Sequence, residues 1–237
     1  MGVNLKKKYK LILIILICSL LAIVINFINI EDKVSVLAIG DGVAKGITSY
    51  NMEGISYNDY LKDYFLNKEK LKNYNTEFSK KDLTTKKLYN YLVKNSLGYN
   101  TKKPIKQLIA KANLLIINIG MDELEKISLD KNNEREKIID YLNYYDKFCG
   151  ELRKFYNKNI IIVGLYPTKD LNTNLIYSIN NNLKQIASQN NTSFIDIMAL
   201  SMNPKYYGDN NSYYMNNLGH EKIFELIKRT IMKNNFW

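Results

Sequence analysis

Short, almost wholly apolar runs recur along this chain between longer amphipathic segments, and this alternation constrains the fold more than any other feature. Three runs are the clearest, VSVLAIG at 34–40, LLIINIG at 114–120 and NIIIVGLYP at 159–167. They are continuously apolar, as strands are when both faces of a sheet are covered. Weaker strand candidates are LKNYNTEF at 71–78 and SFIDI at 193–197. Between the runs, the spacing of apolar residues predicts helices over 57–71, 80–97, 105–112, 133–157, 174–189 and 218–234.

Strands that alternate with helices of this length are joined by right-handed crossovers. The sequence therefore predicts a three-layer α/β/α domain with a central parallel sheet. Ligands of such sheets bind at the carboxyl ends of the strands. This rule places 40–46, 120–124 and the loop after Ile197 around one rim, where functional side chains are expected.

An uncharged apolar run occupies residues 11–30. A helix of this length, at 1.5 Å per residue, matches the roughly 30 Å hydrocarbon core of a bilayer. The run is longer than the apolar part of a signal peptide, and no small-residue cleavage site follows it. Four lysines and no acidic residue precede it. We expect a basic cytoplasmic tail at 1–10, a single uncleaved transmembrane anchor at 11–30 and an extracytoplasmic domain at 31–237.

The formal net charge of +11 limits the classes of partner. Lys6, Lys7, Lys8 and Lys10 supply four of these charges, and the remaining excess is spread along 31–237 without a dense basic stripe. This pattern favours a solvated surface over a nucleic-acid site, so no nucleic-acid partner is expected. The domain has one cysteine, Cys149, and the chain one histidine, which excludes an internal disulfide and a Cys/His metal cluster. No cofactor is predicted.

Three segments at the predicted rim carry recognisable motifs: VLAIGDGVAKG at 36–46, ANLLIINIGMDEL at 112–124 and NSYYMNNLGHEKI at 211–223. They resemble the first, third and fifth motif blocks of the SGNH (GDSL-type) hydrolases, a family of esterases, lipases and carbohydrate deacetylases. Asp41 matches the aspartate of G-D-S-x-x-x-G, and Gly120 matches the glycine of G-x-N-D. The resemblance covers about 34–233 and implies the three-layer α/β fold of that family.

The same resemblance shows that the chemical positions are altered. Family members use a serine nucleophile, a histidine base and an aspartate that orients the histidine. Here Gly42 stands at the serine position, Tyr214 at the histidine position and Asn211 at the aspartate position. Asp122 replaces the oxyanion-binding asparagine and brings a carboxylate toward a developing negative charge. In the family, the amide of the serine and a second-block glycine also bind the oxyanion, but the corresponding second-block region here, 73–85, contains no glycine.

Other side chains near the rim offer alternative chemistry. Asp41 is expected to accept backbone amides in its tight turn, and Asp122 and Glu123 to cap the start of a helix. Together the three carboxylates could instead hold a cation or act as acid and base. His220 would become a base only in a shifted register of the last motif. Tyr214 and its neighbouring tyrosines could line a pocket for a sugar.

The leading interpretation is a membrane-anchored, extracytoplasmic SGNH-hydrolase-like domain that has lost the Ser-His-Asp mechanism. It would act as a binding or scaffolding module at the cell surface, and the resemblance implies a glycan or cell-wall ligand. Two alternatives stay open. One is an active hydrolase of esters or acetyl groups that uses Asp41, Asp122, Glu123 or His220, and the other is electrostatic binding of anionic envelope polymers.

Overall fold

The computed structural model describes residues 9–10, 12–20, 33–130, 132–208 and 212–236. The chain divides into two units, Met1–Lys33 and Val34–Trp237. In the first unit, residues 12–20 are helical and their apolar side chains are exposed. Most of the predicted tail, 1–8, and much of the predicted anchor, 11 and 21–30, lie outside the described residues. Within the part of the chain that is described, no helix is both long and apolar enough to cross a membrane.

A parallel sheet forms the centre of the second unit. Its strands are β1 (Val34–Gly40), β2 (Leu71–Ser79), β3 (Leu114–Asn118), β4 (Asn159–Val163) and β5 (Ser193–Ile195), in the order β2-β1-β3-β4-β5. All five predicted runs are strands. β1 and β3 are buried along their whole length, whereas β2 is an edge strand and half-exposed, which explains its mixed composition. β3 is shorter than predicted because the backbone turns at Gly120, whose φ is 131°.

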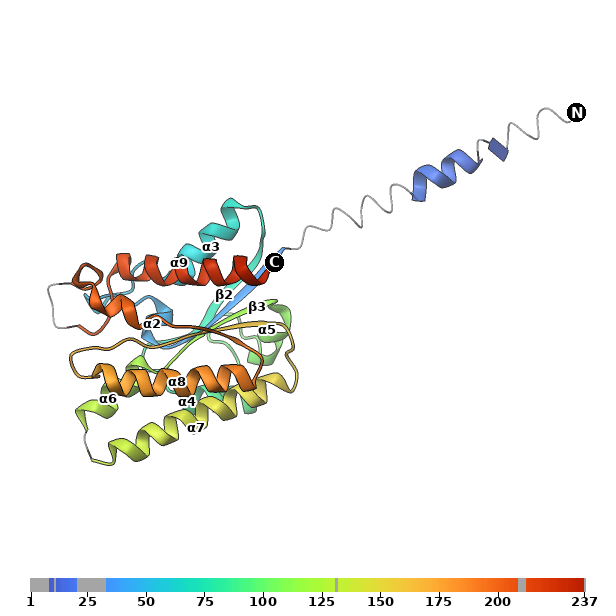
Figure 1. Ribbon diagram of the computed structural model, residues 1–237. Helices are drawn as coiled ribbons and strands as arrows, with labels where there is room; N and C mark the ends of the chain where they lie inside the picture. The colour runs from blue at the N-terminus through green and yellow to red at the C-terminus, as the bar shows by residue number, and fades with distance from the viewer. Residues whose placement is uncertain (1–8, 11, 21–32, 131, 209–211, 237) are drawn as a thin grey trace, which may run out of the picture. The chain divides into compact units, whose positions relative to one another are not determined.

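Helices cover both faces of this sheet. They are α2 (Gly42–Lys45), α3 (Tyr57–Asn67), α4 (Thr85–Val93), α5 (Ile105–Lys111), α6 (Met121–Leu129), α7 (Glu134–Arg153), α8 (Thr173–Gln189) and α9 (Asn217–Asn234). Figure 1 shows α3 and α9 on one face and α4, α7 and α8 on the other. The predicted three-layer α/β/α architecture is therefore confirmed.

Local capping sets several helix boundaries. Ser56 and Asp59 form a reciprocal capping box at the start of α3. Thr84 caps α4, so the helix predicted from residue 80 begins only at Thr85. Asn216 caps α9 through the backbone N–H of Gly219. α2 and α6 follow strands directly, and they place short helix starts at the carboxyl edge of the sheet.

The strand order creates a switch point beside β1. The chain runs from β1 to β2 on one side and then returns to β3 on the other side. Crevices in open parallel sheets form where the order reverses in this way. The ends of β1 and β3 are joined there by a hydrogen bond from the N–H of Asp41 to the carbonyl of Asn118, at 3.1 Å.

Candidate functional site

Asp41 ties together the two turns at the switch point. Its carboxylate accepts the backbone N–H groups of Val43 at 3.1 Å, Gly120 at 2.8 Å and Asp122 at 3.3 Å. The side chain is fully buried. Burial and the nearby Asp122 raise the pKa of Asp41 well above its ordinary value, and the three N–H groups oppose this rise. Asp41 therefore accepts amides in the turn, as expected for its structural role.

Asp122 is the centre of the hydrogen-bond network. Its Oδ2 accepts the backbone N–H groups of Gly42 at 3.0 Å and Asp82 at 2.7 Å. Its Oδ1 accepts the hydroxyls of Tyr214 at 2.6 Å and Tyr213 at 3.3 Å. The side chain is 1% exposed, so these bonds replace water around a buried carboxyl group.

Asp122 thus fills an anion-binding position with a group of the protein itself. The family resemblance assigns oxyanion binding to the amide of residue 42 and to the amide of a second-block glycine. In this structure the amides of Gly42 and Asp82 converge on one oxygen of Asp122. An oxyanion of a substrate would have to displace that carboxylate before it could reach the same donors.

Sequence reasoning missed Asp82. Its φ is 62°, in the left-handed region that favours glycine but that aspartate also enters. The backbone can therefore present its N–H here although 73–85 contains no glycine. A signal was present, since Asp82 follows soon after the end of β2, at the rim predicted for ligands.

Tyr214 occupies the space that a side chain at residue 42 would need. A Cβ atom on Gly42 would lie 2.2 Å from the Tyr214 hydroxyl and 2.8 Å from two of its ring carbons. The Tyr213 ring packs against it with centroids 4.3 Å apart, and the two hydroxyls are 3.1 Å apart. Burial and the charge of Asp122 raise the pKa of Tyr214 far above its ordinary value. The phenol is therefore a hydrogen-bond donor and not a base at neutral pH.

His220 does not join this network. It is buried, its ring stacks on Tyr57, and its Nε2 lies 3.4 Å from the carbonyl of Ile47. Its Nδ1 has no hydrogen-bond partner among the described atoms. Burial lowers the pKa of His220 to about 4, so the ring is neutral. The structure therefore places no serine, threonine or cysteine in a hydrogen bond with His220 in the described part of the chain.

Glu123 points away from the other two carboxylates. It accepts the backbone N–H of Thr85 at 2.8 Å and the Thr85 hydroxyl at 3.0 Å, and burial raises its pKa. Asp122 and Glu123 both lie in the first turn of α6, but neither caps it, because the N-cap is Gly120. The expectation of side-chain capping at this helix is therefore wrong.

No three His, Cys, Asp or Glu side chains among the described residues form a group that could hold a metal ion. Asn211, the remaining altered motif position, lies outside the described residues.

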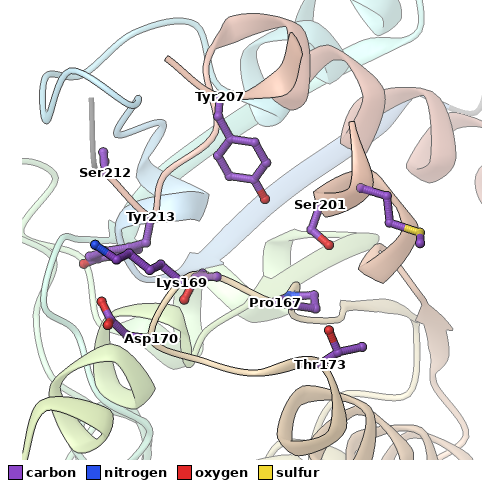
Figure 2. Close-up of a pocket in the computed structure, with 10 residues that line it drawn as sticks. Pro167, Lys169, Asp170, Thr173, Ser201, Tyr207, Ser212 and Tyr213 are labelled. Atoms are coloured by element: carbon purple, nitrogen blue, oxygen red, sulfur yellow. The ribbon is translucent and has the colours of Figure 1, made fainter. Parts of the chain in front are cut away.

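A cavity of about 500 Å³ adjoins the network. It is lined by Pro167, Thr168, Lys169, Asp170, Thr173, Ser201, Met202, Tyr207, Ser212 and Tyr213. Figure 2 shows the Tyr207 hydroxyl directed into this space, and this buried hydroxyl has no partner among the described atoms. Tyr213 borders both the cavity and the Asp122 network. A mixed wall of tyrosines and polar groups suits a ligand that carries hydroxyls.

Neither serine hydroxyl of the described lining is paired with a base. Ser201 donates to the carbonyl of Met198 at 2.8 Å, and the Ser212 hydroxyl accepts the N–H of Tyr214 at 3.2 Å. The Thr168 hydroxyl donates a hydrogen bond to a carboxylate oxygen of Glu125. The described cavity can thus bind and orient a molecule, and neither serine of its lining is activated by a base.

Comparisons with known proteins agree with this fold. A family model described as GDSL-like lipase/acylhydrolase matches residues 36–227. The acetylxylan esterase Axe2 from Geobacillus stearothermophilus superposes with a TM-score of 0.61 at 16% identity, covering 85% of this chain and 96% of that one. A lipase/acylhydrolase from Enterococcus faecalis gives 0.61 at 15% identity, with coverages of 84% and 96%. TesA gives 0.61 at 12%, with 84% and 98%. Among curated proteins, none matches this chain.

Proposed function

This chain belongs to the GDSL-like lipase/acylhydrolase family, and we propose that it is a member whose esterase site is closed by its own side chains and does not hydrolyse esters. One observation carries the proposal. The Tyr214 hydroxyl lies 2.2 Å from the position of a Cβ on residue 42 and donates to Asp122, which holds the amides of Gly42 and Asp82. The space for a nucleophile and the donors for an oxyanion are thus both taken.

Three requirements of acyl transfer are unmet together. Gly42 has no hydroxyl to attack a carbonyl carbon, and the phenol of Tyr214 stays protonated at neutral pH. The carboxylate of Asp122 has the same sign of charge as an oxyanion, so it cannot stabilise one. Loss of a single oxyanion donor alone costs roughly 100-fold to 1,000-fold in rate in serine hydrolases.

We propose further that the domain is a binding or scaffolding module for a glycan or cell-wall ligand. The cavity bordered by Tyr207 and Tyr213 supports this, since tyrosine rings stack on sugars and their hydroxyls bond to them. The similarity to an esterase that acts on acetylated xylan agrees with a carbohydrate ligand. The proposal also includes the anchor at 11–30, which the exposed apolar helix at 12–20 supports.

A turnover assay tests the absence of hydrolysis. We expect no hydrolysis of p-nitrophenyl acetate or of acetylated xylooligosaccharides by the full-length protein. Turnover that disappears in His220→Ala or Asp122→Ala would instead establish an active hydrolase with chemistry of its own. The assay decides between these two functions directly.

A repair series tests why the site is inactive. The triple variant Gly42→Ser, Asn211→Asp, Tyr214→His should remain inactive, because Asp122 still occupies the amides of Gly42 and Asp82. Adding Asp122→Asn should create measurable turnover. The matched control is the same quadruple variant with Gly42→Ala, which lacks the nucleophile. Strong activity in the triple variant would contradict the role assigned to Asp122.

A binding titration tests the ligand class. Xylooligosaccharides should bind the wild-type protein, and Tyr213→Ala should weaken binding at least tenfold if its ring stacks on the sugar. Tyr177→Ala is the matched control, because Tyr177 is 60% exposed and lies on α8 outside the cavity lining. Equal loss in both variants would argue against a sugar in this cavity.

Membrane fractionation tests the anchor. The full-length chain should stay in the membrane pellet after alkaline carbonate washing, and protease added to intact cells should digest the part after residue 30. Release by carbonate, or protection from protease, would contradict the proposed single span and orientation.

A further inference from the structure

The two edges of the sheet carry opposite charge. One edge is formed by the segments that lead into the strands and by the helix ends beside them. We call this edge the amino-edge face, and its described segments are residue 33, 68–72, 111–113, 151–158, 190–193 and 233–236. It holds nine basic residues, Lys33, Lys68, Lys70, Lys72, Lys111, Arg153, Lys154, Lys158 and Lys233, and two acidic ones, Glu69 and Glu151. The described segments at the carboxyl edge, 41–56, 80–84, 119–130, 165–172 and 196–208, hold nine acidic residues and six basic ones.

The start of β1, helix α5 and the C-terminal end lie at one end of the domain in Figure 1, and the Asn234 side chain reaches the Ser193 hydroxyl at the start of β5. The basic residues that are spread along the sequence therefore gather on one face. All strands are parallel, so every segment that leads into a strand reaches the same edge.

Part of this positive charge has a structural use. Arg153 donates to the carbonyls of Tyr156, Lys158, Asn190 and Asn191, which joins the end of α7 to the loop before β5. Lys158 donates to two carbonyls at the end of α5. Such cations complement the negative ends of helices.

Five other lysines of this face form no ion pair with a described acidic residue. Lys154 pairs with Glu151, but no ion pair within 4.0 Å joins a described acid to the five lysines Lys68, Lys70, Lys72, Lys111 and Lys233. Their charges are therefore available to an anionic partner.

Apolar side chains are interspersed with these lysines. Leu66 is 48% exposed, Met232 51% and Phe155 39%. A hollow of about 350 Å³ between α3 and α9 is lined by Tyr64, Phe65, Lys68, Lys70 and Met232. Basic residues beside exposed apolar ones are typical of surfaces that bind anionic lipid, in which the apolar groups enter the headgroup region. A polyanion in water would gain little from them.

The position of this face in the chain agrees with a lipid partner. Only Glu31, Asp32 and Lys33 separate the apolar run from Val34, the first residue of β1. Three extended residues span about 10 Å at most, which is close to the Debye length at physiological salt. Even with Glu31 and Asp32 counted, basic residues of this face outnumber acidic ones by five.

We propose that the amino-edge face docks on anionic phospholipid headgroups of the membrane that holds the anchor, with the carboxyl edge and its cavity turned away from the bilayer. This inference rests on the proposed anchor. Docking fixes the orientation of the cavity and would present it to ligands outside the membrane.

Hydrogen exchange of the full-length protein in nanodiscs tests the docking. In nanodiscs that contain phosphatidylglycerol, amides of 66–72, 154–158 and 230–236 should exchange more slowly than in phosphatidylcholine alone, and high salt should remove the difference. If each lysine contributes roughly fivefold, Lys68→Gln, Lys70→Gln, Lys233→Gln together lower the ratio of docked to undocked protein by roughly 100-fold. The matched control, Lys80→Gln, Lys87→Gln, Lys205→Gln, removes the same charge elsewhere and should keep the protection.

Three results would overturn the docking proposal. They are equal exchange in both lipids, equal loss of protection in the two triple variants, and protection of the same segments by soluble polyphosphate but not by anionic lipid. The salt comparison on the wild-type protein decides the matter even where a variant folds poorly. Release of the chain from membranes by carbonate would instead refute the anchor, so the two failures are distinguishable.

Discussion

The close contact between Gly42 and Tyr214 predicts a stability effect of unusual sign. Gly42 begins α2 and does not have a positive φ, so its backbone allows any residue. Replacing a glycine by alanine at such a position normally stabilises a protein by about 0.4–1 kcal/mol. Here the added Cβ would lie 2.2 Å from the Tyr214 hydroxyl, more than 1 Å inside the 3.4 Å at which ordinary contact begins. Gly42→Ala should therefore destabilise the fold.

The magnitude follows from what Tyr214 must give up. Its hydroxyl donates to Asp122 at 2.6 Å, and a hydrogen bond to a charged group contributes about 1.5–3 kcal/mol. Overpacking of a buried site costs a further 1–3 kcal/mol, roughly. Offset by the gain in chain entropy, the net loss in free energy of unfolding should be about 1.5–5.5 kcal/mol.

A double-mutant cycle isolates this contact. Urea denaturation followed by far-UV circular dichroism should give a loss for Gly42→Ala in the wild-type protein and no loss, or a small gain, in a Tyr214→Ala background. A Gly42→Ala protein as stable as the wild type would refute the reasoning. Equal losses in the two backgrounds would show that Tyr214 is not the cause.

Two further predictions concern the buried imidazole of His220 and the half-buried guanidinium of Arg153. Because the pKa of His220 is about 4 in the folded protein against an ordinary 6.5, the unfolded chain takes up the proton first, and stability is lost as the pH falls from 6.5 toward 4. This loss of unfolding free energy should be about 3 kcal/mol. His220→Phe should flatten the measured dependence of unfolding free energy on pH between 6.5 and 4. An unchanged slope in this variant would contradict the role assigned to His220. Arg153→Lys removes the guanidinium group that donates to four backbone carbonyls. It should lower the free energy of unfolding, measured by urea denaturation, by about 2 kcal/mol. The matched control is Lys154→Ala, because the Lys154 side chain is 71% exposed; this change should lower the free energy of unfolding by less than about 0.5 kcal/mol. Equal losses in the two variants would be evidence against a stabilising role of the Arg153 guanidinium.

Much of the fold could be predicted because burial leaves a local pattern. The continuous apolar runs of β1, β3 and β4 are buried on both faces, and each predicted helix overlaps an observed one. Boundaries were predicted less well. α4 begins five residues later than predicted, because Thr84 caps it, and periodicity alone does not show which hydroxyl will do so.

The candidate site could be predicted only in part. The motif letters placed Asp41, Gly42 and Asp122 at one rim, and the structure brings them together. They did not reveal that Asp122 accepts the amide of Asp82, which is forty residues away, or that Glu123 points to Thr85. Adjacent acids on a helix point in different directions, since successive residues are about 100° apart around its axis.

The sequence by itself determined the five parallel strands, six of the helices and the absence of a hydroxyl at residue 42. Only the tertiary structure decided that the Tyr214 ring fills the space beside that glycine and that the lysines preceding the strands share one face. The physical reason is that hydrophobic periodicity records which side of an element is buried. The partners of a polar group depend on side-chain directions and on contacts between segments far apart in the chain, which no local pattern encodes.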